Sequence, residues 1–389
     1  MRTIISSVSC PMPPAPRPGS IPRDIAAVAD YEPFARRCLD DNAWAYLAGG
    51  AADEHTLRWN RAAFDAIRLQ GSVLADVSGG HTRLTLFGHD YAHPVFLAPV
   101  AHQRLFHPDG ELATAQAAEA MEAAMLVSTL ASTRLEDIAR AGRAPLWFQL
   151  YVQPDRGFTR TLVERAEAAG CRALVVTVDA PVWGLRNREQ RAGFQLPPGV
   201  EPVNLRGMSM PGTPQLAPGQ SMVFDGLMAH APTWRDIEAL RGLTRLPLIL
   251  KGICSARDAQ QAARLGIDGV IVSNHGGRTL DTLPASIDAL PVIADAVGPS
   301  LPLLLDGGIR RGSDIVKALA LGARAVLIGR PYLHGLATAG ALGAAHVIKL
   351  LREELEVTMA LCGCARLQDI DRRILFTPLP GRTSEPEKR

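Results

Sequence analysis

Eight short apolar runs recur along the chain, each followed by turn residues, and most of them then by an alanine-rich amphipathic segment. Runs of this kind are typical of strands buried on both faces of a parallel sheet. Their starts lie 22 to 33 residues apart, the length of one strand-helix unit, except between the fourth and the fifth. The runs are Val95–Val100, Ala124–Thr129, Leu146–Val152, Ala173–Asp179, Pro247–Ile253, Gly269–His275, Pro302–Gly308 and Ala325–Pro331.

Eight consecutive units of this length predict an α/β fold in which the strands close into a (β/α)8 TIM barrel. The alternative is an open doubly wound sheet, which usually carries a glycine-rich fingerprint loop after its first strand. No such loop follows the run Val95–Val100. The closed barrel is therefore the favoured interpretation.

The barrel belongs to one predicted domain, residues 21–376. After the fourth run, residues 187–233 carry Pro197-Pro198 and little periodicity. Long loops over a barrel mouth are often lids, so we predict a lid here. Residues 21–94 form an N-terminal extension, helical around Tyr31–Ala48. The segment 1–20 and the polar tail 377–389 are predicted to be disordered.

Charge and cysteine usage disfavour several protein classes. The 41 basic and 39 acidic residues leave a net charge of +2, which argues against nucleic acid as the main partner. Without a run of 18 apolar residues, no transmembrane segment is predicted, and Pro11–Pro18 is unlike a signal peptide. The six cysteines lack the spacing of a disulfide framework, and Cys362-Gly-Cys364 lacks the second ligand pair of a zinc site. We expect no metal and a reducing, cytoplasmic location.

The sixth apolar run leads directly into Ser273-Asn-His-Gly-Gly-Arg278. Barrels of this type keep their catalytic groups at the carboxyl ends of the strands. His275 is a base that titrates near neutral pH, and Arg278 can hold a carboxylate through two parallel hydrogen bonds. A base beside a carboxylate clamp is what oxidation of a 2-hydroxy acid requires. The same pocket is predicted to contain the other polar strand ends: Ser128, Thr129, Gln149, Tyr151, Thr177, Asp179, Lys251, Asp306, Gly329 and Arg330.

Two further features suggest a bound phosphorylated cofactor. The seventh and eighth runs end in Asp306-Gly-Gly-Ile-Arg-Arg-Gly312 and Gly329-Arg330-Pro331. The loops after strands seven and eight are the usual phosphate site of such a barrel, with glycine amides and a helix N-terminus facing the anion. Lys251 interrupts the fifth run, and a buried lysine needs a ligand or a partner. A structural salt bridge inside the barrel is the alternative reading of Lys251.

The chain also carries nine ordered strings that together resemble one family. They are Ala48-Gly-Gly-Ala-Ala-Asp53, Ala98-Pro-Val-Ala101, His107-Pro-Asp-Gly-Glu111, Gln149-Leu-Tyr151, Thr177-Val-Asp-Ala-Pro181, Leu250-Lys-Gly252, Ser273-Asn-His-Gly-Gly-Arg278, Asp306-Gly-Gly-Ile-Arg-Arg-Gly312 and Ile328-Gly-Arg-Pro331. From about Asp24 to Leu367 the chain resembles the FMN-dependent 2-hydroxy acid oxidases and dehydrogenases, which include glycolate oxidase, lactate oxidase and mandelate-oxidising enzymes. The stretch Ala98–Glu111 is most similar to bacterial 4-hydroxymandelate oxidases.

The resemblance implies a role for each matching position. His275, Asp179 and Lys251 would be catalytic, and Lys251 would place a fixed cation beside the flavin ring. The substrate would be held by Tyr46, Tyr151, Arg186 and Arg278. The cofactor FMN would contact Pro99, Val100, Ala101, Ser128, Gln149, Thr177, Lys251, Ser273, Asp306, Gly307, Gly308, Arg310, Gly329 and Arg330.

Three positions depart from the family pattern. Leu130 stands where glycolate oxidase has an aromatic residue over the pocket, so the wall is aliphatic there. His102 occupies a variable position beside the flavin loop. Leu185 replaces a basic residue next to Arg186, so carboxylate binding would depend more on Arg278. These departures concern the identity of the substrate and leave the reaction class unchanged.

The sequence thus predicts oxidation of an L-2-hydroxy acid to the 2-oxo acid, with a mandelate-type aryl substrate favoured and lactate next. Ala101 resembles the oxidase branch, so we expect O2 as the acceptor and H2O2 as the by-product. A homotetramer is implied by the resemblance alone. The alternatives are a dehydrogenase with a quinone or other acceptor, a non-redox lyase or isomerase acting on a sugar phosphate, and a catalytically silent flavin-carrying protein.

Overall fold

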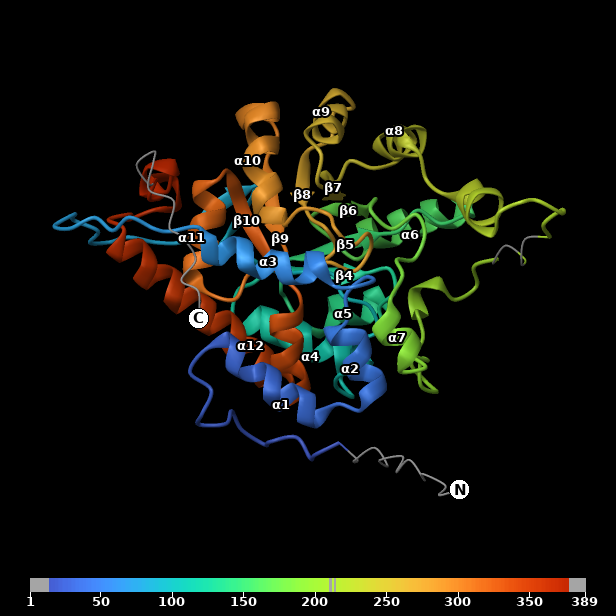
Figure 1. Ribbon diagram of the computed structural model, residues 1–389, viewed down its shortest axis with the longest axis horizontal. Coiled ribbons are helices and arrows are strands. Elements are labelled where there is room, and N and C mark those ends of the chain that lie inside the picture. Colours follow the sequence, from blue (N-terminus) through green and yellow to red (C-terminus); the bar gives the residue numbers. More distant parts are fainter. Residues whose placement is uncertain (1–13, 210–211, 213–214, 378–389) are drawn as a thin grey trace, which may run out of the picture.

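Eight parallel strands close into a barrel in the order β10-β3-β4-β5-β6-β7-β8-β9 (Figure 1). The computed structural model describes residues 14–209, 212 and 215–377. The barrel strands are β3 (Val95–Leu97), β4 (Met125–Ser128), β5 (Leu146–Leu150), β6 (Leu174–Thr177), β7 (Leu248–Ile253), β8 (Gly269–Val272), β9 (Leu303–Asp306) and β10 (Ala323–Ile328). The predicted (β/α)8 architecture is confirmed.

Each predicted run overlaps one strand, and all eight strands are shorter than predicted. β8 ends at Val272, three residues before His275, and β3 ends at Leu97, before Pro99. Proline cannot donate to a sheet, and the polar residues at the ends of the runs leave the ladder to face the pocket. β10 instead begins two residues before the predicted Ala325. The main error in the predicted bounds is therefore that residues at the strand ends were assigned to the strands.

Helices surround the barrel and alternate with the strands. They are α4 (Gly110–Ala120), α5 (Leu135–Ala141), α6 (Arg156–Ala168), α8 (Trp234–Leu243), α9 (Ala256–Arg264), α10 (Ser286–Val297), α11 (Gly312–Ala320) and α12 (Arg330–Leu361). The long helix α12 is kinked where Ala339 and Gly340 leave helical geometry. Its first turn lies directly after β10, at the carboxyl-terminal mouth of the barrel.

The N-terminal extension holds more structure than the predicted helical stretch. Tyr31–Ala48 is divided into α1 (Tyr31–Cys38) and α2 (Asp41–Ala48), because Leu39 is extended and the Asp40 carboxylate caps α2 by accepting from Ala43 N at 2.7 Å. A third helix, α3 (His55–Ala66), and a hairpin of β1 (Leu84–Leu86) and β2 (His89–Tyr91) follow. α1 packs along α12, as Figure 1 shows at the lower part of the molecule.

The predicted disordered ends lie mostly outside the described residues. Residues 1–13 and 378–389 are in this group. Within 14–20, Ala15 N donates to Arg37 O at 2.8 Å and the Arg17 guanidinium donates to Phe106 O at 3.1 Å. This part of the segment therefore lies against the domain.

The predicted lid begins with the short helix α7 (Asn187–Arg191), which packs beside α2. The Asn42 side chain and the Gln195 backbone exchange hydrogen bonds of 2.8 and 3.0 Å, and Asn204 Oδ1 accepts from Leu135 N at 3.0 Å. Farther along, residues 222–230 project at the right edge of Figure 1, and Phe224 is 78% exposed. No helix in the described part of the chain is long and apolar enough to cross a membrane.

Candidate active site

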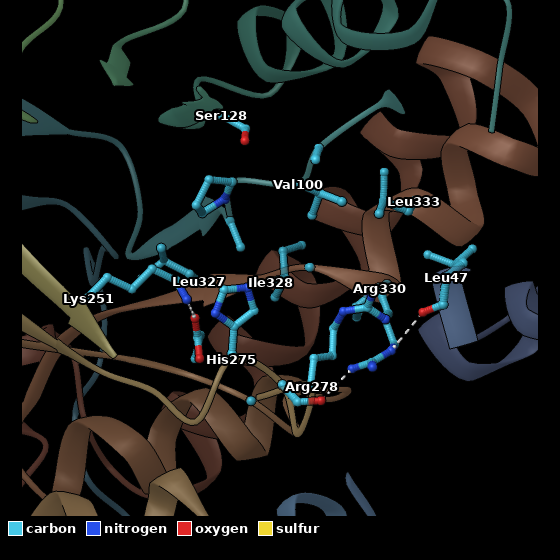
Figure 2. Close-up of a pocket in the computed structure, with 18 of the residues that line it drawn as sticks. Leu47, Val100, Ser128, Lys251, His275, Arg278, Leu327, Ile328, Arg330 and Leu333 are labelled. Atoms are coloured by element: carbon cyan, nitrogen blue, oxygen red, sulfur yellow. Dashed lines mark hydrogen bonds and ion pairs between the residues drawn. The ribbon is translucent and has the colours of Figure 1, made fainter. Parts of the chain in front are cut away.

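A pocket opens at the carboxyl-terminal ends of the strands, where the sequence predicted it (Figure 2). Lys251 and His275 lie on one side of the view and Arg330 and Leu47 on the other. The predicted site residues that line the pocket are Tyr46, Pro99, Val100, Ala101, Ser128, Gln149, Tyr151, Thr177, Arg186, Lys251, His275, Arg278, Asp306, Gly307, Gly308, Arg310, Gly329 and Arg330. Of the remaining predicted residues, Asp179 and Ser273 bond to residues in this lining, and Thr129 lies behind it.

His275 is paired with Asp179. Its Nδ1 lies 2.8 Å from Asp179 Oδ1, and Asp179 is almost fully buried. Burial by itself would raise the pKa of Asp179, but attraction to His275 and Lys251 outweighs it, so the pKa is lowered. An ionised Asp179 can only accept, so Nδ1 carries the proton and Nε2 is left with a free lone pair. His275 also has a φ of 57°, in the left-handed region where a non-glycine residue is uncommon.

Lys251 forms a salt bridge inside the barrel, which is the alternative interpretation that its sequence position left open. Its Nζ lies 3.0 Å from Asp306 Oδ2 and 3.0 Å from Ser273 Oγ. Burial would lower the pKa of Lys251, but Asp306 and Asp179 raise it overall, so the ammonium is charged. The side chain also lines the pocket. The structural and the ligand-binding readings of Lys251 therefore hold together.

Gln149 offers an unused donor inside the pocket. Its Oε1 accepts from Ser128 Oγ at 3.2 Å and from Thr129 N at 3.3 Å, which fixes the orientation of the amide. Its Nε2 is buried and has no hydrogen-bond partner among the described residues. Thr129 Oγ1 donates to Gln149 O at 2.6 Å and accepts from Tyr151 N at 3.1 Å, so Thr129 holds the strand ends together. A buried amide without a partner is costly, which indicates a ligand acceptor at this point.

Gly307 and Gly308 follow β9 and line the pocket, and their backbone packs closely against Asn60 of α3. Gly307 and Gly308 have φ values of 93° and 89°, and a Cβ on Gly308 would lie 2.0 Å from Asn60 O. Only glycine fits there. Arg310 lines the pocket, and burial lowers the pKa of its guanidinium.

The later part of this loop differs from the prediction. The amides of Arg310 and Arg311 donate to Asp314 Oδ2 at 2.9 and 3.0 Å, and Gly312 N donates to Glu354 Oε2 at 2.9 Å. These carboxylates occupy the start of α11. The amides available to an anion are therefore those nearer Gly307, and not those of residues 310–312.

The guanidinium of Arg330 binds the protein backbone. It donates to Leu47 O at 2.9 Å, Gly276 O at 2.9 Å and Gly49 O at 2.8 Å. Burial, together with Arg278 and Arg310, lowers the pKa of Arg330 to about 9. The side chain therefore joins the end of α2 to the loop after β8, as the dashed lines in Figure 2 show in part. What Arg330 offers a phosphate is its position at the first turn of α12 together with its positive charge.

Arg278 and Arg186 converge with Tyr46 at the outer part of the pocket. Arg278 Nη1 donates to Tyr46 O at 2.6 Å and Gly49 O at 2.8 Å, and its guanidinium carbon lies 4.9 Å from the Tyr46 ring centre. Arg186 Nε is buried without a partner in the described structure. Burial, then Arg186, lower the pKa of Arg278. The arrangement leaves guanidinium donors facing a ligand.

Two predicted substrate-binding phenols, those of Tyr46 and Tyr151, also line the pocket. Burial raises the pKa of Tyr46, and it also raises that of Tyr151, where Asp179 adds to the effect. Both phenols are therefore neutral donors at physiological pH. The Tyr46 ring stacks on Phe194, with ring centres 4.9 Å apart.

The three departures from the family pattern occupy different places. Leu130 lines the pocket, as predicted. His102 is buried just outside the lining, with Nδ1 lacking a partner among the described residues, and burial lowers its pKa to about 4. Leu185 is 68% exposed and lies outside the lining, and its carbonyl accepts from Ala52 N at 2.6 Å.

Several residues in or next to the pocket were not predicted from the sequence. Trp183 lines the pocket mouth although it is 65% exposed. Asn60 on α3 exchanges hydrogen bonds of 2.9 and 2.8 Å with Asn274, the neighbour of His275. Glu189 binds Arg278. A polar residue on the buried face of a helix was the available signal for Asn60, and Trp183 offered none because its place depends on the path of the lid.

The residues present fit a flavin mononucleotide. Gln149 presents a buried donor without a partner among the described residues, Lys251 a buried cation, and Gly307 and Gly308 a stretch of backbone that lines the pocket. Arg310 adds positive charge at the phosphate end. A polar ring system at one end and an anion at the other is what this set of groups recognises.

Comparison with known proteins gives the same result. A family model described as FMN-dependent dehydrogenase matches residues 35–377. An L-lactate oxidase from Roseobacter sp. (strain GAI101) is 52% identical over 344 residues, which cover 88% of this chain and 92% of the relative. A peroxisomal (S)-2-hydroxy-acid oxidase from Oryza sativa subsp. japonica is 44% identical over 352 residues, which cover 90% of this chain and 95% of the relative. The solved structure of a mandelate oxidase with benzoyl-formic acid has a TM-score of 0.82 and 42% identity, covering 91% of this chain and 98% of that one.

The fold and the site define a TIM-barrel flavoenzyme whose cofactor is FMN. The chain belongs to the family of FMN-dependent 2-hydroxy acid oxidases, and its reaction class is FMN-dependent oxidation of a 2-hydroxy acid.

Proposed function

We propose that this enzyme oxidises an L-2-hydroxy acid with an apolar side chain to the 2-oxo acid and passes the electrons to O2, which gives H2O2. An aryl substrate of the mandelate type is favoured and lactate is second. The observation that carries the proposal is the His275–Asp179 pair, 2.8 Å apart, in the same pocket as Arg186 and Arg278.

His275 acts as the base. Because Asp179 holds Nδ1–H, Nε2 is the atom that takes the proton of the substrate hydroxyl. Asp179 stabilises the imidazolium that forms, since a neighbouring carboxylate favours the charged ring. FMN, when bound, would supply the acceptor for the hydride that leaves C2. The proton and the hydride together account for the two electrons and two hydrogens that the substrate loses.

The remaining groups fix the substrate in one orientation. Arg186 and Arg278 bind the carboxylate, and the neutral phenols of Tyr46 and Tyr151 donate to its oxygens or to the hydroxyl. With the carboxylate, the hydroxyl and the transferred hydrogen accounted for, the fourth substituent of C2 points to the apolar wall. Leu130 and Trp183 supply that wall.

Support for the acceptor and for the substrate comes from different residues. Ala101, in the loop after β3, resembles the oxidase branch, which supports O2 as the acceptor. The aliphatic Leu130 and the exposed face of Trp183 support a bulky apolar side chain. Lactate is a second candidate because three relatives that are 49–52% identical to this chain are L-lactate oxidases.

The test is an oxygen-electrode screen of the purified holoenzyme with (S)-mandelate, 4-hydroxymandelate, L-lactate and glycolate. We expect O2 uptake with matching H2O2, and the highest kcat/KM for an aryl acid. Uptake that is negligible beside reduction of a dye acceptor would reject O2 as the acceptor. A kcat/KM that is highest for glycolate would reject the apolar wall, and one that is highest for lactate would select the second candidate.

A homotetramer and a cytoplasmic location remain predictions from the resemblance and from cysteine usage. Light scattering coupled to gel filtration measures the first. A mass other than four times 41.7 kDa would contradict it.

A further inference from the structure

Glu189 places a carboxylate between the two arginines that are proposed to bind the substrate carboxylate. On α7, its Oε1 lies 2.8 Å from Arg278 Nη2 and its Oε2 lies 3.6 Å from Arg186 Nη1. The residue is only 9% exposed. A buried carboxylate that bridges two largely buried guanidinium groups is part of the binding site's charge and differs from a solvated surface pair.

The donors that remain on the arginines define what a ligand meets. Arg278 Nη1 is taken by Tyr46 O and Gly49 O, and Glu189 takes one hydrogen of Nη2. Arg186 Nε is buried and has no partner within the described residues. A ligand carboxylate therefore meets two guanidinium charges, one of which Glu189 already compensates, so the net charge of the cluster is +2 − 1 = +1.

We propose that Glu189 is a specificity-determining residue that sets the clamp to accept one carboxylate and repels a second. The inference rests on the proposed function, in which Arg186 and Arg278 form the clamp. In a pocket of low effective dielectric, an additional anionic group close to Glu189 is repelled by its charge, while a single carboxylate is balanced by the remaining positive charge. Glu189 also positions Arg278, since it fixes Nη2.

The decisive variant is Glu189→Gln, which keeps an oxygen acceptor for Arg278 and removes the charge. Three probes that lack the hydroxyl group cannot be oxidised. They are phenylacetamide, phenylacetate and phenylmalonate, which share a phenyl ring and carry zero, one and two carboxylate charges. Their competitive inhibition constants are measured on the holoenzyme. We expect phenylacetate to bind about tenfold tighter to the variant, phenylmalonate to gain more than that, and phenylacetamide to change by less than about twofold.

Two further variants separate charge from structure. The acid-to-amide ratio is the affinity for phenylacetate divided by the affinity for phenylacetamide. Glu189→Asp keeps the charge and is expected to keep the wild-type value of this ratio. Glu54→Gln is the matched control, because Glu54 pairs at 2.5 Å with Arg188, a neighbour on α7 that lies outside the pocket lining. It is expected to leave all three constants near wild type. Bound FMN per subunit verifies that each variant is folded.

The proposal is wrong if Glu189→Gln leaves the acid-to-amide ratio at the wild-type value or lowers it. If Glu189 had a purely structural role, its replacement would weaken the binding of phenylacetate and of phenylacetamide alike, and the ratio would not change. Failure of the proposed function looks different. In that case the wild-type enzyme itself would bind phenylacetamide as tightly as phenylacetate and would oxidise none of the 2-hydroxy acids.

Discussion

The two sides of the active-site pocket are built differently. On the barrel side, Lys251 and Asp306 are 4% and 6% exposed and form an ion pair of 3.0 Å. On the lid side, Trp183 is 65% exposed and Phe224, farther along the same loop, is 78% exposed. The barrel side is held by strands with buried hydrogen bonds, whereas the lid side is attached through α7, Asn42 and Asn204.

This contrast teaches where each part of the function resides. Groups that transfer protons or hold the cofactor require positions fixed to a fraction of an ångström, and strand ends supply that precision. Groups that select the side chain of the substrate need only an apolar surface, which a loop can provide and change. The predictions below test this division, beginning with the barrel side.

Replacement of His275 by Ala removes the proposed base and is expected to produce the largest loss of activity. Turnover should fall by roughly 10²–10⁴-fold or more, because no other group is placed to take the hydroxyl proton through the same geometry. FMN content should remain near one per subunit. Steady-state kinetics and the flavin spectrum measure both quantities. Near-normal turnover with bound FMN would remove His275 from the base role and weaken the contrast between the two sides.

Arg278→Lys keeps a positive charge but loses the planar fork. The lysine cannot reach the carboxylate while also holding Tyr46 O and Gly49 O. Transition-state binding should therefore weaken by about 2 kcal/mol or more, which lowers kcat/KM roughly 30-fold. The companion measurement uses the methyl ester of the best substrate with the wild-type enzyme. An ester that reacts as fast as the acid would contradict the clamp.

Trp183→Leu tests the lid side. We expect the ratio of kcat/KM for (S)-mandelate to that for L-lactate to fall about tenfold, because an aromatic stacking partner is lost for the larger substrate only. Trp183→Phe should retain most of the ratio. Trp59→Leu is the matched control, since Trp59 is also exposed, at 42%, and lies outside the pocket lining. An unchanged ratio in Trp183→Leu would show that the side chain of the substrate is selected elsewhere.

The smallest effect is expected in the exposed part of the lid. Phe224→Ser should change the free energy of unfolding by less than about 0.5 kcal/mol, because its side chain is already mostly in solvent. The matched barrel substitution, Phe148→Ala on β5, should cost about 3–5 kcal/mol, since Phe148 is fully buried. Denaturant unfolding monitored by circular dichroism measures both. A large loss in Phe224→Ser would mean that this part of the lid is buried by a contact in solution.

The pocket residues that could be predicted from the sequence are those whose place follows from their position on a barrel strand. His275, Lys251 and Gln149 were placed in one pocket because each lies at the middle or in the carboxyl-terminal half of a predicted run, and parallel strands bring such residues to one mouth. The N-terminal extension was harder to predict. Asn60 reaches Asn274 only because α3 crosses the barrel, and the separation of 214 residues leaves no local signal.

Arg330 and Glu189 show the same limit for charged residues. A glycine-arginine pair after the eighth strand predicts an anion site, yet the guanidinium of Arg330 binds three backbone carbonyls from two other segments. The partners of a long charged side chain depend on which chain segments lie within its reach, and sequence spacing does not specify them.

The sequence by itself determined the barrel, its cofactor class and the place of His275 in the pocket, because hydrophobic periodicity and short motifs encode strand order and the residues at strand ends. Only the tertiary structure decided that Trp183 stands at the pocket mouth, that Glu189 lies between Arg186 and Arg278, and that Arg330 joins α2 to the loop after β8. These contacts join segments distant in sequence, and their geometry is set by the packing of the lid and the extension against the barrel and not by any local preference of the chain.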